Sequence, residues 1–479
     1  MKNVEIRVEG QALDLLPNTS FTLERFNPVF DFGTVQGSRV YPFTVPFSPR
    51  NNRIFQYAND PQSVWTPRDY YTEKYADGDL IERGFTFLNK IQSNGFEIAF
   101  GQNLGDFFGD LQDVPLNRLP LGSEALPSNL GNMLPEKIIN GTLVYCLPTT
   151  INSQFYGGAL AGFNGRLNDY AANVYTNATP KIPFIGVHWL LKRLGELCGF
   201  TVSGEFLEDV SAKNLIIYNT FALDGSPTLL TYANHLPESL TVRSLFLALK
   251  LPPFGITSFF DVQTRTITMR YTQSVMNAET RLDYTPKTNP VYVPGTIADR
   301  RLELDWDLDG DDGLMKVVPI ELQKYTAPIA GTASLFSLKG VFSTLKMDTA
   351  TGLPAAEQQG ITALTGQMDK TFKPRLLFWH GVVGGVPTAK TTHGNMNLSF
   401  SGANNLREKF WTKYESWRLA TFPVALKTSL NGSNLAQLDF HQRAGQDITI
   451  HVKGVDYYVQ RISTTLPLEN YANLDVWKK

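Results

Sequence analysis

The chain has 479 residues, which exceeds the size of one ordinary hydrophobic core and predicts several domains. Hydrophobic residues make up 42% of the chain and charged residues only 18%, so core material is plentiful while the surface is poor in charge. The formal net charge of −2 argues against general electrostatic attraction to nucleic acid. Two cysteines, Cys146 and Cys198, are too few for a disulfide scaffold.

The first residues alternate apolar and charged side chains at Val4, Ile6 and Val8. This pattern predicts a strand and not a signal peptide. No apolar run in the chain approaches the ~20 residues that a membrane-spanning helix needs. We therefore expect a soluble protein that is made in the cytoplasm.

Residues 1–113 favour a β-rich, barrel-like domain. The sequence Ser93-Asn94-Gly95 separates two apolar runs, 80–88 and 96–100, and predicts a hairpin because Asn-Gly tolerates positive φ. Residues 40–47 are also apolar, but Pro42 and Pro46 each remove a backbone N–H. These prolines predict an edge strand or an extended arm.

Residues 114–180 carry prolines, glycines, asparagines and aromatic residues without a sustained period. Aromatic residues recur at 155–156 and at Phe163, where a disordered segment would have few. We expect an ordered loop insertion. A loop of this length is usually functional or reaches a neighbouring protein.

Residues 181–275 contain the same short design twice, an amphipathic helix followed by an apolar strand. The first helix is expected over 187–198, where Gly199 ends it, and its strand follows directly. The second is expected over 241–249, with Thr241 as a candidate N-cap, and feeds a hairpin. Together the two copies predict an α+β region of helix–hairpin modules.

Residues 276–400 favour a second β-rich domain, with loops expected around 286–294 and 348–359. Residues 401–479 predict a closing unit in which Asn404 or Asn405 caps a helix that precedes a terminal hairpin. The expected fold class is α+β and β-rich, with several domains that include small antiparallel β-barrels or sandwiches.

One acidic run resembles the first half of a calcium-binding loop. Asp305, Asp307 and Asp309 alternate, and Gly310 takes the glycine position. However, Lys316 stands where the loop needs a bidentate glutamate, and the apolar alternation before the run favours a strand that enters an exposed acidic turn. The three aspartates are the metal candidates of the sequence.

No other motif predicts chemistry. Residues 384–391 miss a phosphate-binding loop because Ala389 replaces the second required glycine. The six histidines do not have zinc-site spacing, and no GxSxG motif is present. The sequence therefore names no catalytic or cofactor-binding residue, and we expect a protein without enzymatic activity or a cofactor.

Several stretches together resemble structural tail proteins of phages and prophages from Bacteroidetes-type hosts. They are GSRVYPFTVP and PRNNRI (residues 37–46 and 49–54), FY with FNGRLN (155–156 and 163–168), IPF (182–184), GFTVSGEF (199–206), LAQLDF (435–440) and YYV (457–459). The helix–hairpin modules also resemble those of tail, or baseplate, hub proteins. Hubs carry two small β-barrels and mixed α+β units, and they assemble as trimers between a six-fold tail tube and a three-fold spike.

The resemblance implies a virion protein that forms a homo-oligomer, with a trimer favoured, around the tail channel. Its expected partners are tail-tube and spike or fibre proteins, and phage DNA would pass through without specific binding. A carbohydrate-binding or carbohydrate-cleaving tail protein is the alternative, for which four tryptophans (379, 411, 417 and 477) could stack on sugars. Another ring component, such as a head–tail connector, is a third possibility.

Overall fold

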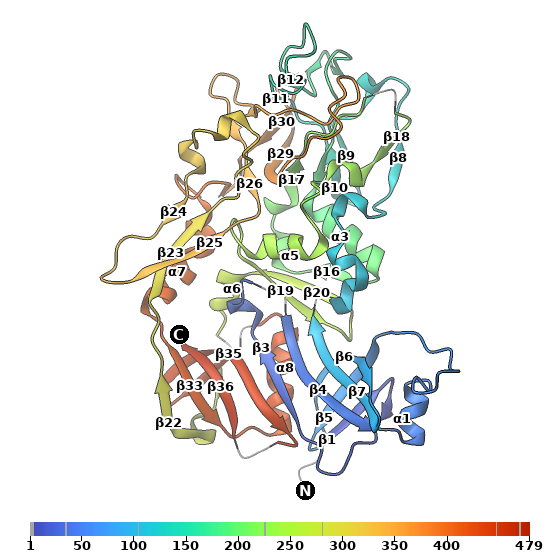
Figure 1. Ribbon diagram of the computed structural model, residues 1–479. Coiled ribbons are helices and arrows are strands. Elements are labelled where there is room, and N and C mark those ends of the chain that lie inside the picture. Colours follow the sequence, from blue (N-terminus) through green and yellow to red (C-terminus); the bar gives the residue numbers. More distant parts are fainter. Residues whose placement is uncertain are drawn as a thin grey trace.

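A computed structural model describes residues 4–33, 36–103, 105–224, 227–279, 281–446, 448–468 and 471–479. The molecule is elongated and built from several sheets with helices between them (Figure 1). This confirms the predicted β-rich α+β class. The pairings among the described strands form open sheets and close no barrel, so the predicted barrels are not confirmed.

The largest sheet is built from both ends of the chain. Antiparallel pairing of Phe21 with Leu466 and of Phe26 with Arg461 joins the N-terminal strands to the C-terminal ones, and Figure 1 shows them side by side at the base. Its strands are, in spatial order, β2 (Gln11–Ala12), β1 (Val4–Val8), β5 (Tyr70–Ala76), β6 (Asp79–Ile91), β7 (Gly95–Asn103), β4 (Gln36–Pro46), β3 (Phe21–Phe26), β35 (Val455–Leu466), β36 (Ala472–Lys478), β33 (Pro423–Thr428) and β22 (Thr288–Pro294), with β34 (Thr449–Val452) and β21 (Arg281–Asp283) branching from β35. Residues 1–113 and 401–479 therefore share one sheet; the division of the chain into domains stays a prediction.

A buried cation holds helix α8 (Gly432–Arg443) against this sheet. The side chain of Arg25 is buried and donates to the backbone oxygens of Ile81 and Leu435, each at 2.9 Å. The same guanidinium lies 3.6 Å from a Glu82 oxygen and 3.5 Å from an Asp439 oxygen. One side chain thus connects β3, β6 and α8, which are far apart in sequence.

Strand β4 lies inside the sheet, between β7 and β3, and not at an edge as its prolines predicted. The register with β7 shifts between Val40 and Phe43, so Pro42 falls in an irregular step of the ladder. On the other side, β3 pairs with residues 38–40 of β4 only. Pro46 is the last residue of the strand. Neither proline therefore occupies a ladder position that requires its missing N–H.

The two predicted modules fold together. Helix α3 spans Val187–Cys198 and ends at Gly199, whose φ of 72° is the left-handed conformation that glycine favours. Helix α5 spans Val242–Lys250. The strand of the first module, β16 (Thr201–Ser203), pairs in parallel with β20 (Thr266–Tyr271), which forms the predicted hairpin with β19 (Ile256–Asp261). Both predictions are confirmed, and one three-stranded sheet joins the copies.

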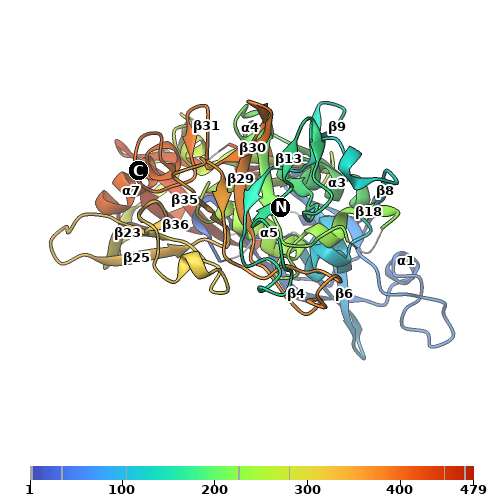
Figure 2. The ribbon, with the colours of Figure 1, turned by 90° about the horizontal axis from the view of Figure 1, so that it is seen from above.

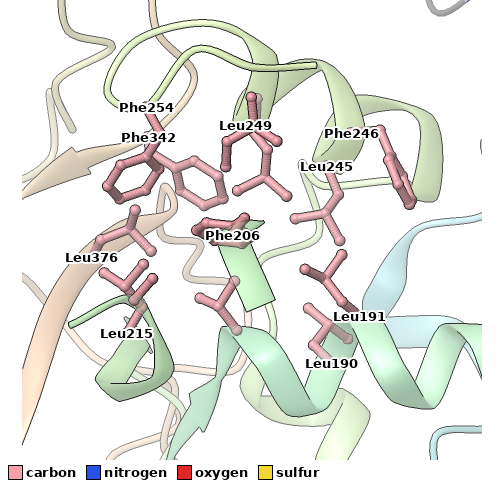
Figure 3. Close-up of a cluster of buried hydrophobic side chains, with 14 of the residues drawn as sticks. Leu190, Leu191, Phe206, Leu215, Leu245, Phe246, Leu249, Phe254, Phe342 and Leu376 are labelled. Carbon is pink, nitrogen blue, oxygen red and sulfur yellow. The ribbon is translucent and has the colours of Figure 1, made fainter. Parts of the chain in front are cut away.

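The modules also share a core. Leu190 and Leu191 of α3 face Leu245 and Leu249 of α5, with Phe206 between them (Figure 3). All five side chains are fully buried. Side chains from the neighbouring seven-stranded sheet close the same cluster, so the modules form the middle of the molecule and not a separate lobe.

Removal of the α5 cap gives a modest, local test of this arrangement. The Thr241 hydroxyl accepts from the Ser244 N–H at 3.1 Å, and the Ser244 hydroxyl accepts from the Thr241 N–H at 2.7 Å. We expect Thr241→Ala to lower the free energy of unfolding by about 1 kcal/mol, because it leaves a helix N–H without its acceptor. Urea denaturation measures the change. Thr264→Ala, at an exposed turn position, is the control and should leave stability unaltered within about 0.5 kcal/mol.

Residues 114–180, expected as a loop insertion, contribute strands to a seven-stranded sheet. Its strands are β26 (Ser343–Thr344), β29 (Arg375–Val383), β17 (Leu215–Tyr218), β15 (Phe184–Gly186), β10 (Thr142–Cys146) and β9 (Glu136–Ile139), with β30 (Val386–Lys390) on β29. Strands β9 and β10 are a hairpin that turns at Asn140 and Gly141, both with positive φ. Phe155 and Tyr156 are buried in a core of their own beside this sheet.

The remaining elements are short. Strand β22 occupies residues 288–294, where a loop was expected, and β23 (Asp299–Asp305) lies between β24 (Tyr325–Thr326) and β25 (Ser334–Lys339). The C-terminal helix begins as a π-helical turn, Arg407–Trp411, and continues as α7 (Thr412–Ala420). Asn405 caps it by accepting from the Glu408 N–H at 2.9 Å.

The other strands are β8 (Ser123–Ala125), β11 (Thr150–Ile151), β12 (Arg166–Leu167), β13 (Tyr170–Ala171), β14 (Val174–Tyr175), β18 (Leu229–Thr231), β27 (Lys346–Met347), β28 (Pro354–Ala355), β31 (Thr392–His393) and β32 (Met396–Asn397), and the other helices are α1 (Pro49–Ile54), α2 (Gly105–Phe108), α4 (Glu205–Glu208) and α6 (Thr272–Met276). In the described ranges, no helix is both long and apolar enough to cross a membrane.

Candidate interaction surface

Exposed large apolar side chains recur along one stretch of the chain, residues 292–335. Figures 1 and 2 both place β23 and β25 on the side opposite α1. Seven exposed large apolar residues fall on β22, on β25 and on the segments around β24, and we call them the lateral apolar surface: Tyr292, Val293, Val317, Val318, Ile320, Ile329 and Leu335. They come from 44 consecutive residues of the chain.

Two strands on this side, β22 and β25, are edge strands of their sheets. Strand β22 is the last strand of the large sheet and pairs, among the described strands, with β33 alone. Tyr292 and Val293 on it are exposed, Val293 to 63%. Strand β25 is the outer strand beside β23 and exposes most of its side chains. Sheet edges of this kind offer unpaired backbone groups to another chain.

The segment between β23 and β24 presents its apolar residues in a fixed conformation. Val317 is 84% exposed and Ile320 is 75% exposed, although Met315 and Leu322 on either side of them are buried. The Ser399 hydroxyl donates to the backbone oxygen of Glu321 at 2.7 Å and connects this segment to a distant part of the chain. Val317 and Ile320 therefore remain exposed between two buried neighbours. Exposed apolar residues that gather on a surface are typical of interaction sites.

Within the ranges that the structure describes, the metal candidates Asp305, Asp307 and Asp309 are not brought together around one position. Asp307 lies 2.9 Å from the Lys339 ammonium and 3.0 Å from that of Lys373. The Oδ1 of Asp305 accepts from the next backbone N–H, and Asp309 is buried and points elsewhere. In the described part of the chain, no three His, Cys, Asp or Glu side chains are placed to hold one ion.

The acidic turn is a buried ion-pair network and not the exposed turn that was expected. Arg375, on β29, is fully buried, and its guanidinium lies 2.5 Å from an Asp312 oxygen and 3.7 Å from an Asp309 oxygen. It also donates to Gln358 and lies over the ring of Tyr218, 4.5 Å from the ring centre. Burial raises the pKa of Tyr218 to about 12, so its hydroxyl stays neutral.

The two buried aspartates are saturated with donors. Asp312 accepts from the backbone N–H groups of Leu314, at 3.0 Å, and of Glu357, at 2.8 Å. Asp309 accepts from the Gln358 amide at 2.9 Å and from the Lys373 N–H at 3.0 Å. These carboxylates therefore face the interior and hold the turn against β29.

The tryptophans considered for sugar stacking are core residues. Trp379, Trp411 and Trp417 are buried, and Trp477 is partly buried. Their indole N–H groups are used within the protein, for example from Trp411 to the Pro253 oxygen at 3.0 Å. The carbohydrate alternative therefore has no support from these four side chains.

Sequence reasoning missed the lateral apolar surface and Arg375. Residues 317–320, Val-Val-Pro-Ile, carried a usable signal, because an apolar run between Lys316 and Glu321 has no periodicity that would bury it. Arg375 carried none, since the nearer of its two carboxylate partners, Asp312, lies 63 residues earlier in the chain.

Comparison with known proteins gives structural superpositions of low score and no sequence match. No family model and no curated protein matches the sequence. A 43 kDa tail protein of prophage MuSo2 from Shewanella oneidensis superimposes with a TM-score of 0.39 and 8% identity, over 99% of this chain and 96% of that one. A tail protein from Neisseria meningitidis gives 0.38 and 9%, over 100% and 96%. Prophage tail protein gp18 from Listeria monocytogenes gives 0.34 and 8%, over 99% and 94%. At TM-scores below 0.5, these superpositions assign neither fold family nor function.

Proposed function

We propose that this protein is a structural component of a phage tail, a baseplate hub that oligomerises around the tail channel. In this role it joins the tail tube to a spike or to fibres, resides in the virion and has no enzymatic activity. The sequence resemblance supports the hub assignment. The lateral apolar surface carries the assembly role, because a fixed, exposed apolar run is unfavourable in water unless another protein covers it.

The lateral apolar surface is best covered by a second copy of the chain. Two sheet edges on the same side can pair with backbone, and the exposed valines and isoleucine can pack between them. A trimer requires a head-to-tail contact, in which each copy would use this surface against a different surface of its neighbour. Such a contact forms a closed ring when its rotation matches the three-fold symmetry. The resemblance favours three copies.

The mass of the purified chain tests this proposal. We expect native mass spectrometry to give a trimer for the natural chain and a monomer for the double variant Val317→Asp, Ile320→Asp, because two buried, unpaired charges would outweigh a contact of ordinary size. Leu134→Asp is the control: Leu134 is 69% exposed but lies outside the lateral apolar surface. This variant should remain trimeric.

The other outcomes separate the alternatives. A ring of six or twelve copies would favour the role of a head–tail connector over that of a hub. A natural chain that stays monomeric at tens of micromolar, with no change in the double variant, would contradict self-association through this surface.

A further inference from the structure

The upper part of the molecule contains a cavity that the proposed assembly role does not use. Its volume is about 890 Å³, within the range of small-molecule and oligosaccharide sites. The walls come from residues 126–130, 156–163, 177–181, 223–224, 227–228 and Leu364. One wall follows the paired strands β8 and β18, where the Leu126 N–H donates to the Thr228 oxygen at 2.9 Å. Figure 1 shows these two strands at the upper right.

One wall of the cavity is a fixed aromatic pair. The rings of Tyr156 and Phe163 meet edge to face with centroids 4.9 Å apart, and Phe155 holds Tyr156 from behind at the same distance. Tyr156 is buried, whereas Phe163 is partly exposed. A ring held in this way is a preorganised platform for the C–H face of a pyranose.

The cavity contains one cationic side chain, that of Lys181, among its described lining residues. Lys181 is buried, and its ammonium donates to the backbone oxygens of Thr176, at 2.6 Å, and of Thr179. Within the described residues no carboxylate lies at ion-pair distance from it. Asp169, the acid nearest in electrostatic effect, is paired with Arg166 at 3.3 Å.

The ammonium is therefore a buried charge with two carbonyl acceptors for its three N–H bonds and, among the described residues, no carboxylate at ion-pair distance. Burial lowers the pKa of Lys181 to about 8, so the group is still mostly charged at pH 7. A buried cation of this kind is unfavourable until an anion approaches it.

The cavity's own acid does not fill this role. Asp224 accepts from the Thr362 hydroxyl and from the backbone N–H groups of Ala363, at 3.2 Å, and Leu364, at 3.4 Å. Its carboxylate is thus hydrogen-bonded to residues 362–364.

We propose that this cavity binds an acidic oligosaccharide, with a sugar carboxylate at Lys181 and a pyranose face on Phe163. The amides of Asn129 and Asn177 and the hydroxyl of Ser128, which also line it, suit the remaining sugar hydroxyls. A single cation is too little for a nucleotide triphosphate, and the amides and hydroxyls are unsuited to a lipid chain. The site goes beyond the hub role and would let a tail protein touch an acidic surface glycan.

The test uses the full chain and two sets of probes. On an array, oligosaccharides that carry galacturonic, glucuronic or sialic acid are compared with neutral oligosaccharides of the same length; the best acid is then titrated by calorimetry. We expect retention of acidic chains only and at least tenfold weaker binding by the methyl ester of the same chain. Lys181→Met and Phe163→Ala should each weaken binding about tenfold or more, since each removes a charge-assisted hydrogen bond or a stacking face.

Controls separate binding from folding. Lys192→Met removes a lysine whose ammonium bonds the Thr142 hydroxyl outside the cavity, and it should bind like the natural chain. Phe163→Ala leaves the Lys181 contacts in place, so it tests the cavity even if Lys181→Met loosens residues 176–181. Retention of no acidic glycan, or equal binding by both cavity variants, would overturn the proposal. Binding of a peptide with a free C-terminal carboxylate, and of no glycan, would overturn it in favour of a partner's chain end.

Discussion

Replacement of Arg375 by methionine should lower the free energy of unfolding by about 3–5 kcal/mol, because it leaves the buried charges of Asp309 and Asp312 without their cation. The substituted side chain fills much of the same space, so the loss is electrostatic more than volumetric. The turn of residues 306–312 would also lose its attachment to β29. Guanidinium denaturation followed by tryptophan fluorescence measures the shift of the midpoint.

Two further variants make this result specific. Lys316→Met removes an exposed cation from the same segment and should change stability by no more than about 0.5 kcal/mol. Arg375→Lys keeps the charge but loses the planar guanidinium that reaches Asp312 and Gln358 together. Its loss of unfolding free energy should therefore lie between those of Lys316→Met and Arg375→Met. If Arg375→Met were as mild as Lys316→Met, the network would not support the fold.

Local signals predicted the local elements of this chain well. Helix α3 follows its predicted bounds because its apolar stripe and its terminal Gly199 are both contained in the segment itself. The hairpin of β6 and β7 forms where Asn94 and Gly95 predicted it, although neither residue has the positive φ on which the prediction rested. Gly95 instead lies against the backbone of Val45, where a larger side chain would clash. The same Asn-Gly signal occurs at Asn140 and Gly141, but its flanking strands are short and β10 takes its second partner from β15, forty residues later.

Long-range pairing could not be predicted in this way. The pairing of Phe21 with Leu466 and the contact of Arg25 with Asp439 depend on segments more than four hundred residues apart. Pro42 predicted an edge strand because proline lacks the N–H that a central strand donates to its neighbour. In the structure, a register shift between β4 and β7 accommodates Pro42 inside the sheet. The acidic turn was interpreted as exposed for the same reason: its burial depends on Arg375, which belongs to another sheet.

Acidification should destabilise the protein steeply between pH 6.5 and pH 4.5 through two buried histidines. Burial lowers the pKa of His188 to about 4 and that of His235 to about 3, from an ordinary value near 6.5. His188 packs edge to face on Phe206 in the central core, and His235 packs on Phe221. Each ring has a buried Nε2 atom without a hydrogen-bond partner among the described residues, so a proton added there would be poorly accommodated.

The loss of stability at low pH follows from proton binding by the unfolded chain. Below pH 6.5 the unfolded chain protonates both rings while the folded protein does not, so protons favour the unfolded state until the pH approaches the folded values. Each pKa unit corresponds to about 1.4 kcal/mol, and the two rings together should remove about 4 kcal/mol between pH 6.5 and pH 4.5. Urea midpoints measured across this range give the slope. His188→Gln and His235→Gln should each flatten this slope by about half. A slope that persists in the double variant His188→Gln, His235→Gln would assign the acid sensitivity to carboxylates instead.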